Sequence, residues 1–148
     1  MPVSDMTAIV TGAASTRGIG RATAHTLAAA GWNIAVLDLD EASAKEAADE
    51  VAERAGVQAF GVRCDVTDET SVEAALDILD GSAPPVGALV NNAGITSPTP
   101  FLEVTGEEWD RIFAVNVRGA FNVTRRVAPR RRLRRCRHRP ANGGPPLG

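Results

Sequence analysis

The chain has 148 residues, of which 44% are hydrophobic, and its formal net charge is −2. This length suits one α/β domain with a buried core, and no stretch reaches the roughly 18 apolar residues of a membrane span. Two cysteines and two histidines are too few for a disulfide framework or a metal cluster, so we expect a metal-free protein. The short polar amino terminus does not resemble a signal peptide, which predicts a cytoplasmic location.

Four short apolar runs predict buried β-strands, at residues 7–11, 32–37, 57–62 and 86–90. Apolar residues at helical spacing predict helices at residues 18–30, 41–55, 69–79 and 105–121. Strands that alternate with helices in this way form parallel β-α-β units. The strands are apolar throughout, as expected when helices cover both faces of a sheet. The sequence therefore predicts an α/β fold with a doubly wound parallel sheet of about four strands.

A glycine-rich turn with Gly12, Gly18 and Gly20 follows the first strand and opens the first helix. Glycines let the backbone turn tightly and approach a pyrophosphate, which binds the free N–H groups at the start of the helix. Asp38 ends the second strand, 18 residues after Gly20, where a carboxylate accepts hydrogen bonds from an adenosine ribose. Either feature alone is common, but together they predict a dinucleotide-binding site.

Three further stretches follow in the chain: Cys-Asp-Val at residues 64–66, Asn-Asn-Ala-Gly at residues 91–94 and Val-Asn-Val-Arg-Gly at residues 115–119. With the glycine turn and Asp38, they resemble the short-chain dehydrogenase/reductase family over about residues 5–126. The resemblance implies an incomplete Rossmann-like sheet. It also implies an oxidoreductase that transfers hydride between an alcohol or ketone and a nicotinamide dinucleotide.

The resemblance also implies roles for individual residues. The expected cofactor-binding residues are Gly12, Arg17, Gly18, Ile19, Gly20, Asp38, Asp65, Val66, Asn92, Ala93 and Gly94. The three glycines of the turn would line the pyrophosphate, residues 65–66 would border the adenine, and residues 92–94 would support the central sheet. Asn116 would be the catalytic asparagine that orders a water for the proton relay. From its place in an apolar stripe alone, Asn116 could equally bond a neighbouring backbone group.

The choice of cofactor follows from charge. The carboxylate of Asp38 suits the free ribose hydroxyl of NAD and repels the 2′-phosphate of NADP, so we expect NAD. Arg17 is a residue type that some NADP-preferring relatives use, but Asp38 is expected to approach the ribose more directly. The turn has five residues between Gly12 and Gly18, where the family commonly has three. We expect this loop to bulge outward and leave binding intact.

The residues that perform proton transfer in the family are absent here. Family members use a tyrosine as general acid/base, a lysine four residues later and a serine that polarises the carbonyl. This chain has no tyrosine, its only lysine is Lys45, and its last serine, Ser97, precedes the helix that carries Asn116. Loss of the proton-transfer group alone slows such reactions by about 10²–10⁴-fold. We therefore expect a catalytically incomplete chain, or alternatively a non-catalytic NAD-binding module.

Charge divides the chain, because residues 1–110 hold all 18 acidic residues and residues 111–148 hold eleven arginines and no acid. After Arg126 the helical pattern stops, and Pro129 and Pro140 oppose a helix. We therefore expect a domain at residues 1–126 and a basic, disordered tail at residues 127–148. The arginine- and proline-rich composition of this tail fits a GC-rich gene read in a shifted frame. The alternative is an arm that binds nucleic acid through phosphate charge, which we expect less because the tail lacks aromatic residues.

The expected partners follow from the same features. They are a nicotinamide dinucleotide and, in full-length relatives, a small alcohol or ketone, with no membrane partner. The strand at residues 86–90 would be an unprotected edge, and the outer face of the helix at residues 109–121 would be exposed. These surfaces predict marginal stability and a homo-oligomer. Residues 96–101 are expected at the rim of a substrate pocket.

Overall fold

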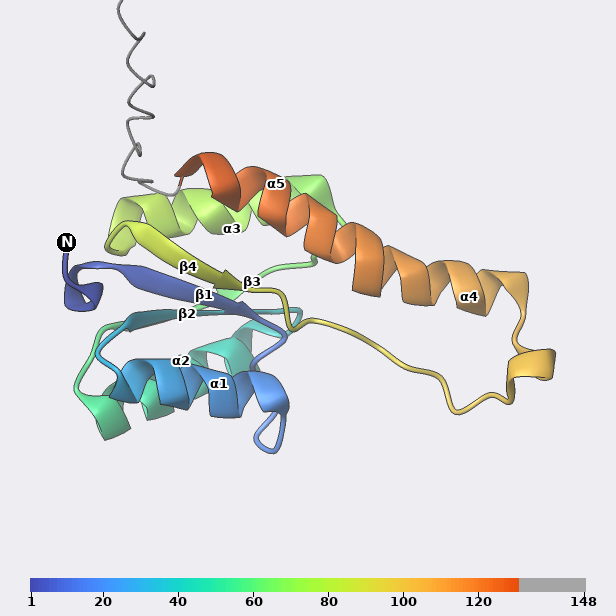
Figure 1. The fold of residues 1–148 in the computed structure, drawn as a ribbon, viewed down its shortest axis with the longest axis horizontal. Coiled ribbons are helices and arrows are strands. Elements are labelled where there is room, and N and C mark those ends of the chain that lie inside the picture. The colour runs from blue at the N-terminus through green and yellow to red at the C-terminus, as the bar shows by residue number, and fades with distance from the viewer. Residues whose placement is uncertain (131–148) are drawn as a thin grey trace, which may run out of the picture.

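The computed structural model describes residues 1–130, and Figure 1 shows them as a layered α/β fold. Within these residues four strands form one sheet in the order β3-β2-β1-β4, and every neighbouring pair is parallel. The strands are β1 (Thr7–Thr11), β2 (Asn33–Asp38), β3 (Ala59–Arg63) and β4 (Val86–Val90). The α/β class and the doubly wound parallel sheet predicted from the sequence are confirmed.

Helices cover both faces of this sheet (Figure 1). On one face lie α1 (Ile19–Ala29) and α2 (Glu41–Ala55), and on the other lie α3 (Glu69–Ser82) and α5 (Ala120–Arg130). Every residue of β1 is buried, because a central strand has helices above and below it. Its side chains alternate between two apolar clusters, one beneath each layer of helices.

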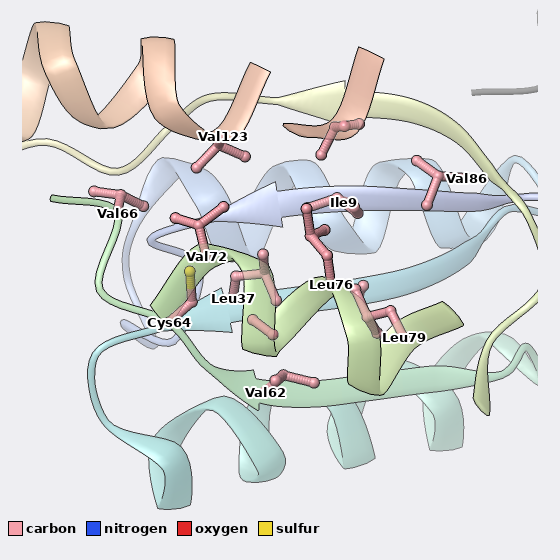
Figure 2. Packing of buried hydrophobic residues seen from close by; sticks show 13 residues of the cluster. Ile9, Leu37, Val62, Cys64, Val66, Val72, Leu76, Leu79, Val86 and Val123 are labelled. Carbon is pink, nitrogen blue, oxygen red and sulfur yellow. The ribbon is translucent and has the colours of Figure 1, made fainter. Parts of the chain in front are cut away.

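Figure 2 shows the cluster between the sheet and α3. Ile9 of β1 and Leu37 of β2 pack there with Leu76 of α3 and Val123 of α5, and all four are at most 1% exposed. On the opposite face, small alanines of α1 and α2 allow the helices to approach the sheet closely. The closest approach is at Gly61 of β3, where a Cβ would lie 2.3 Å from the carbonyl oxygen of Ala44.

Polar side chains define where α2 and α3 begin. The carboxylate of Asp40 accepts from the N–H of Ser43, and that of Asp68 accepts from the N–H of Thr70. Such N-caps satisfy amides that have no partner inside the helix. Both helices start in the loops that follow the carboxyl ends of β2 and β3, at the edge of the sheet where the predicted site residues lie.

The helix predicted at residues 105–121 is not uniform. It consists of α4 (Gly106–Phe113), a π-helical segment η3 (Ala114–Gly119) and the first residues of α5. The wide turn of η3 changes which face of the helix meets the core, because it breaks the 3.6-residue period. Gly119, Asn122, Val123 and Val127 are buried, whereas Trp109, Phe113, Val117 and Phe121 remain exposed.

The described structure continues α5 through residues 127–130, past the boundary expected after Arg126. Val127 is 1% exposed in the core, and Pro129 lies in the last turn of the helix. Pro129 cannot donate a backbone hydrogen bond, but packing of Val127 and the ion pairs of Arg130 with α3 hold this turn in place. The rest of the predicted tail, residues 131–148, lies outside the described residues.

Residues 91–105 and α4 extend away from the sheet as an arm (Figure 1). The hydroxyls of Ser97 and Thr99 both donate to the carboxylate of Glu108 on α4, and these bonds hold the pKa of Glu108 below its ordinary value. The arm also contains the short helix η2 (Phe101–Glu103). Among residues 1–130, no helix is long and apolar enough to cross a membrane.

Candidate functional site

The glycine-rich turn connects β1 to α1 and is built around close backbone contacts. Gly12 has φ +65°, a conformation that residues with a side chain rarely adopt, and its N–H donates to Leu37 O at 2.7 Å. A Cβ on Gly12 would lie 2.7 Å from the Cα of Ala93. Gly18 is the N-cap of α1, so the free amides at the start of this helix face the same edge of the sheet. The first amides of α1, which follow Gly18, therefore offer the backbone donors that an anionic group requires.

The two extra residues of this turn form an exposed tip. The N–H of Gly18 donates to Ser15 O at 3.1 Å, which closes a short loop containing Arg17. Ser15, Thr16 and Arg17 are exposed, whereas Ala14 is buried. The insertion thus lies outside the packed part of the turn, and α1 still begins at Ile19.

Asp38 lies at the carboxyl end of β2, directly beside the glycine turn. Its Oδ2 accepts from the N–H of Ala14 at 2.9 Å and its Oδ1 accepts from the N–H of Leu39 at 2.8 Å. A carboxylate oxygen has two lone-pair sites, so each oxygen keeps one acceptor site for a ligand. Two backbone amides thus orient a carboxylate that can still bind hydroxyl groups.

The loop after β4 is hydrogen-bonded to the end of β1. The side-chain amide of Asn92 donates to Thr11 O at 3.0 Å and to Gly12 O at 2.8 Å. The hydroxyl of Thr11 accepts from the N–H groups of Asn92 and Ala93, each at 3.0 Å. Thr11 was not among the site residues predicted from the sequence, although a polar residue that ends an apolar strand could have indicated it.

The loop after β3 forms another wall of the site. The N–H and hydroxyl of Thr67 donate to Asp65 Oδ1, at 2.9 and 2.7 Å. The amide of Asn122, buried in α5, donates to Val66 O at 3.0 Å. A Cβ on Gly119, the last residue of η3, would lie 2.6 Å from a methyl group of Val66, so the start of α5 can approach this loop only because residue 119 is glycine. The loop position is therefore determined by both its own turn and the last helix.

These loops enclose a pocket of about 370 Å³ at the carboxyl edge of the sheet. Nine of the twelve predicted site residues line it, namely Gly12, Gly18, Ile19, Asp38, Asp65, Val66, Asn92, Ala93 and Gly94. The lining also contains residues that sequence reasoning missed, among them Leu37, Cys64, Thr67, Ile95 and Val115. The structure therefore brings together residues from four separate strand ends, with apolar walls and two carboxylates.

Three predicted site residues do not line the pocket. Gly20 lies beneath it, where a Cβ would be 2.5 Å from the side-chain nitrogen of Asn92. Arg17 is on the exposed tip of the turn. Asn116 pairs with one backbone unit, because its Nδ2 donates to Ile95 O at 2.9 Å and its Oδ1 accepts from Ile95 N–H at 2.8 Å. Asn116 thus makes the backbone contact that was one of its two predicted roles, and it orients Ile95 in the pocket wall.

Charge in the pocket is negative. Asp38 and Asp65 supply its ionisable oxygens, and no lysine or arginine is among the lining residues described. Burial, reinforced by the neighbouring Asp65, raises the pKa of the Cys64 thiol to about 11. This thiol is therefore neutral near pH 7 and adds an apolar surface rather than a nucleophile. Residues 1–130 contain no group of three or more His, Cys, Asp or Glu placed to bind a metal ion.

Comparison with known proteins identifies similar chains of about twice the length. The family model for short chain dehydrogenases matches residues 6–135. The chain is 39% identical over 132 residues to an uncharacterized short-chain type dehydrogenase/reductase of Sinorhizobium fredii, covering 89% of this chain and 52% of that protein. It is 40% identical over 116 residues to the 3-oxoacyl-[acyl-carrier-protein] reductase FabG of Aquifex aeolicus, covering 78% and 46%.

The comparison with solved structures agrees with the sequence comparison. A short-chain type dehydrogenase/reductase from Mycobacterium marinum has a TM-score of 0.78 at 35% identity, with 86% of this chain and 49% of that chain covered. A 3-ketoacyl-ACP reductase from Sinorhizobium meliloti has a TM-score of 0.76 at 37% identity, with 83% and 48% covered. The chain thus spans about half the length of these relatives. The matched family range also includes residues 127–135, beyond the boundary predicted at residue 126.

Proposed function

Since this chain belongs to the short-chain dehydrogenase/reductase family, we propose that its pocket binds a nicotinamide dinucleotide, specifically NAD. The observation that carries the proposal is that Asp38 and the start of α1 open into one pocket at the carboxyl edge of the sheet. In doubly wound folds this is the edge where nucleotides bind. When bound, the dinucleotide would accept hydride from an alcohol, which becomes a ketone, or donate hydride to a ketone in the reverse direction.

The pocket residues match the parts of such a ligand. The backbone of Gly12 and the N-cap Gly18 would face the pyrophosphate, since a helix start attracts anions. The free acceptor sites of Asp38 suit the ribose hydroxyls. Asp65 and Val66 lie in the same pocket wall and would border the adenine. Asp38 keeps acceptor sites for the ribose. The N–H groups of Gly12 and Gly18 already donate to Leu37 O and Ser15 O, so the amides at the start of α1 would bind the pyrophosphate.

Charge supports NAD over NADP. A 2′-phosphate placed near Asp38 would meet a carboxylate, and no described cation lines the pocket to offset the repulsion. Arg17, the residue type that could favour NADP, is on the exposed tip of the turn. The pocket therefore suits an uncharged ribose hydroxyl.

Titration of the full chain with NADH and NADPH, followed by nicotinamide fluorescence, tests both parts of the proposal. We expect the wild type to bind NADH more tightly. We expect Asp38→Asn to weaken NADH binding about tenfold, because a hydrogen bond to a charged group contributes about 1.5 kcal/mol. Absence of binding to either dinucleotide would refute the function. Tighter binding of NADPH by the wild type would refute the cofactor choice alone.

We also propose that residues 1–148 by themselves do not turn over substrate. The chain has no tyrosine, and Lys45 is exposed on α2, paired with Glu41 at 2.5 Å. Ser97 is bonded to Glu108 on the arm, and residues 96–101 do not line the pocket. The relatives named as 3-oxoacyl reductases suggest a 3-oxoacyl thioester as the assay substrate. NADH oxidation above the protein-free rate would contradict this proposal, and Asn116 would then be tested as a catalytic residue.

A non-catalytic NAD-binding module would give the same titration without turnover. Binding of nucleic acid by the basic carboxyl-terminal segment is a different candidate function, and it rests on residues 131–148, outside the described part of the chain. Just before them, Arg126 and Arg130 pair with acidic residues of α3, so these two cations serve the fold. The nucleotide sequence of the gene distinguishes a frame shift from a carboxyl-terminal segment that was selected to bind nucleic acid. The cytoplasmic location stays a prediction, and a homo-oligomer is supported by the exposed apolar residues of α4 and α5.

A further inference from the structure

Within the five-residue stretch of the glycine turn, Ala14 is the residue whose backbone bonds side chains of other elements. Its N–H donates to Asp38 at 2.9 Å, and its carbonyl oxygen accepts from Nη2 of Arg21 at 2.8 Å. Ala14 is buried, whereas the three residues after it are exposed. The N–H and the carbonyl of Ala14 are thus both bonded to side chains, and residues 15–17 are open to solvent.

Arg21 connects this point to a second helix. Its side chain is 4% exposed, and its Nη1 bonds Oε2 of Glu50 on α2 at 2.6 Å. The other oxygen of Glu50 lies 3.3 Å from Nη1 of Arg54, an exposed residue on the outer surface. One guanidinium therefore links α1, α2 and the glycine turn, and its fork geometry allows both bonds at once.

The Arg21–Glu50 pair is partly buried, because the side chain of Arg21 is 4% exposed and that of Glu50 is 36% exposed. Removing the guanidinium from water costs free energy, so such a pair often adds little stability over an apolar contact of the same volume. Arg21 also leaves its Nε buried with no hydrogen-bond partner within residues 1–130. Stability alone does not explain the arginine, whereas the direction of its bond to Ala14 does.

We propose that Arg21 and Glu50 are positioning residues that orient the carboxylate of Asp38 through Ala14 and so sharpen the preference for NAD over NADP. This inference rests on the proposed function. Arg21 fixes the carbonyl of Ala14, the fixed turn aims its N–H at Oδ2 of Asp38, and the carboxylate keeps its free acceptor sites toward the pocket. Groups that are held in place before binding lose less entropy when the ligand arrives.

The test compares NADH and NADPH affinities of the full chain with three single variants. Arg21→Met removes both bonds of the guanidinium and keeps an unbranched side chain. Arg21→Lys keeps a charge for Glu50 but lacks the fork that also reaches Ala14. Arg54→Met is the matched control, because it removes a partner of the same Glu50 on the exposed side. Thermal unfolding of each variant is measured alongside.

We expect Arg21→Met to weaken NADH about tenfold and NADPH about twofold, so that the ratio of the two affinities falls about fivefold. Arg21→Lys is expected to lower the ratio in the same direction with a smaller loss of thermal stability. Arg54→Met is expected to leave both affinities unchanged. In an Asp38→Asn background, Arg21→Lys should change the ratio less than twofold, since the group it orients has lost its charge.

An unchanged affinity ratio in Arg21→Lys would overturn the inference, whatever happens to its melting temperature. Additive effects of Arg21→Lys and Asp38→Asn would overturn it too. In both cases NADH binding by the wild type would leave the proposed function standing. If the wild type binds neither dinucleotide, the proposed function and this inference fail together. If Arg21→Met does not fold, Arg21→Lys decides the question.

Discussion

Gly20 lies where the first turn of α1 touches two loops at once. A Cβ there would be 2.5 Å from Asn92 Nδ2 and 2.7 Å from Gly12 O, and these two atoms are joined by a hydrogen bond. We expect Gly20→Ala to lower the free energy of unfolding by about 1–3 kcal/mol through overpacking. We expect it to weaken NADH binding as well, because the bond that closes the turn is displaced.

The matched control for this change is Gly81→Ala. Gly81 is also in a helix, α3, but a Cβ there meets nothing within 4 Å. Alanine favours a helix over glycine by about 0.5–1 kcal/mol, so this variant should be no less stable than the wild type. Urea unfolding and the NADH titration measure both effects. Equal free energies of unfolding for the two variants would show that the close approach at Gly20 does not contribute to stability.

Cys64 gives the fold a defined dependence on alkaline pH. Its pKa rises from 9.0 to about 11 in the fold, chiefly because the thiol is buried. A raised pKa means that the folded state favours the protonated thiol, so this contribution is present below pH 9 and is lost as the pH rises through 11. The chain has no tyrosine and one lysine, so few other groups titrate in this range.

Urea unfolding between pH 8 and pH 11 tests this prediction in a Cys136→Ser background. The free energy of unfolding should fall across that range, and Cys64→Ala should make the curve flatter. Iodoacetamide should react slowly with Cys64 at pH 8 and more slowly still with NADH bound, because the thiol lines the pocket. Rapid alkylation at pH 8 would be inconsistent with a buried neutral thiol.

The junction between α3 and α5 depends on a row of charges. Arg130 bonds Glu73, Asp77 and Asp80 of α3, at 2.7, 3.2 and 2.9 Å. Arg126 extends the row to Glu69 at 2.8 Å. The bond from Arg130 is the main reason that the pKa of Glu73 is lowered. Stability from this carboxylate is therefore present above its ordinary pKa and is lost as the pH falls through its lowered value.

We expect Arg130→Met to lower the melting temperature by a few degrees in low salt, since a network contributes more than an isolated surface pair. The difference from the wild type should shrink in 1 M NaCl, where such charges are screened. Arg125→Met is the control, because Arg125 lies over the Phe121 ring, 5.8 Å from its centre. A loss that is the same for both variants, or that persists in 1 M NaCl, would show that charge pairing does not hold α5.

The sequence predicts most of the helices and strands, but it does not predict where α5 ends. Local periodicity indicates the strands and helices, and β3 starts only two residues later than predicted, at Ala59. The end of α5 was missed because Pro129 and a run of arginines oppose a helix locally. The acids that stabilise it, such as Glu73, lie more than 50 residues away in the chain. The pattern of neighbouring residues therefore gives no indication that these ion pairs form.

An apolar face on residues 109–121 remains open to solvent. Trp109 and Phe113 stack with their ring centres 4.6 Å apart, and they share this face with Val117 and Phe121. Strand β4 is also at the edge of the sheet, with no strand beyond it within residues 1–130. Large exposed apolar patches favour association, so we expect self-association that increases with concentration.

Phe121→Asp tests this expectation against Ile78→Asp. The two residues are equally exposed, 57% and 55%, but Ile78 is on α3, away from the stacked rings. In sedimentation velocity, Phe121→Asp should reduce the associated fraction and Ile78→Asp should leave it unchanged. A wild-type chain that stays monomeric at every concentration and melts reversibly would contradict the expectation.

Local sequence patterns were enough to predict the class of fold, the edge of the sheet where the pocket forms, and nine residues that line it. These follow from local rules, because strand ends and glycine turns are recorded in neighbouring residues. Three features became visible only in the packed fold: α5 continues past Pro129, η3 leaves Val117 exposed and Gly119 buried, and Arg21 and Glu50 hold Ala14 beside Asp38. Each of these depends on partners distant in the chain, whose geometry exists only after the layers have packed.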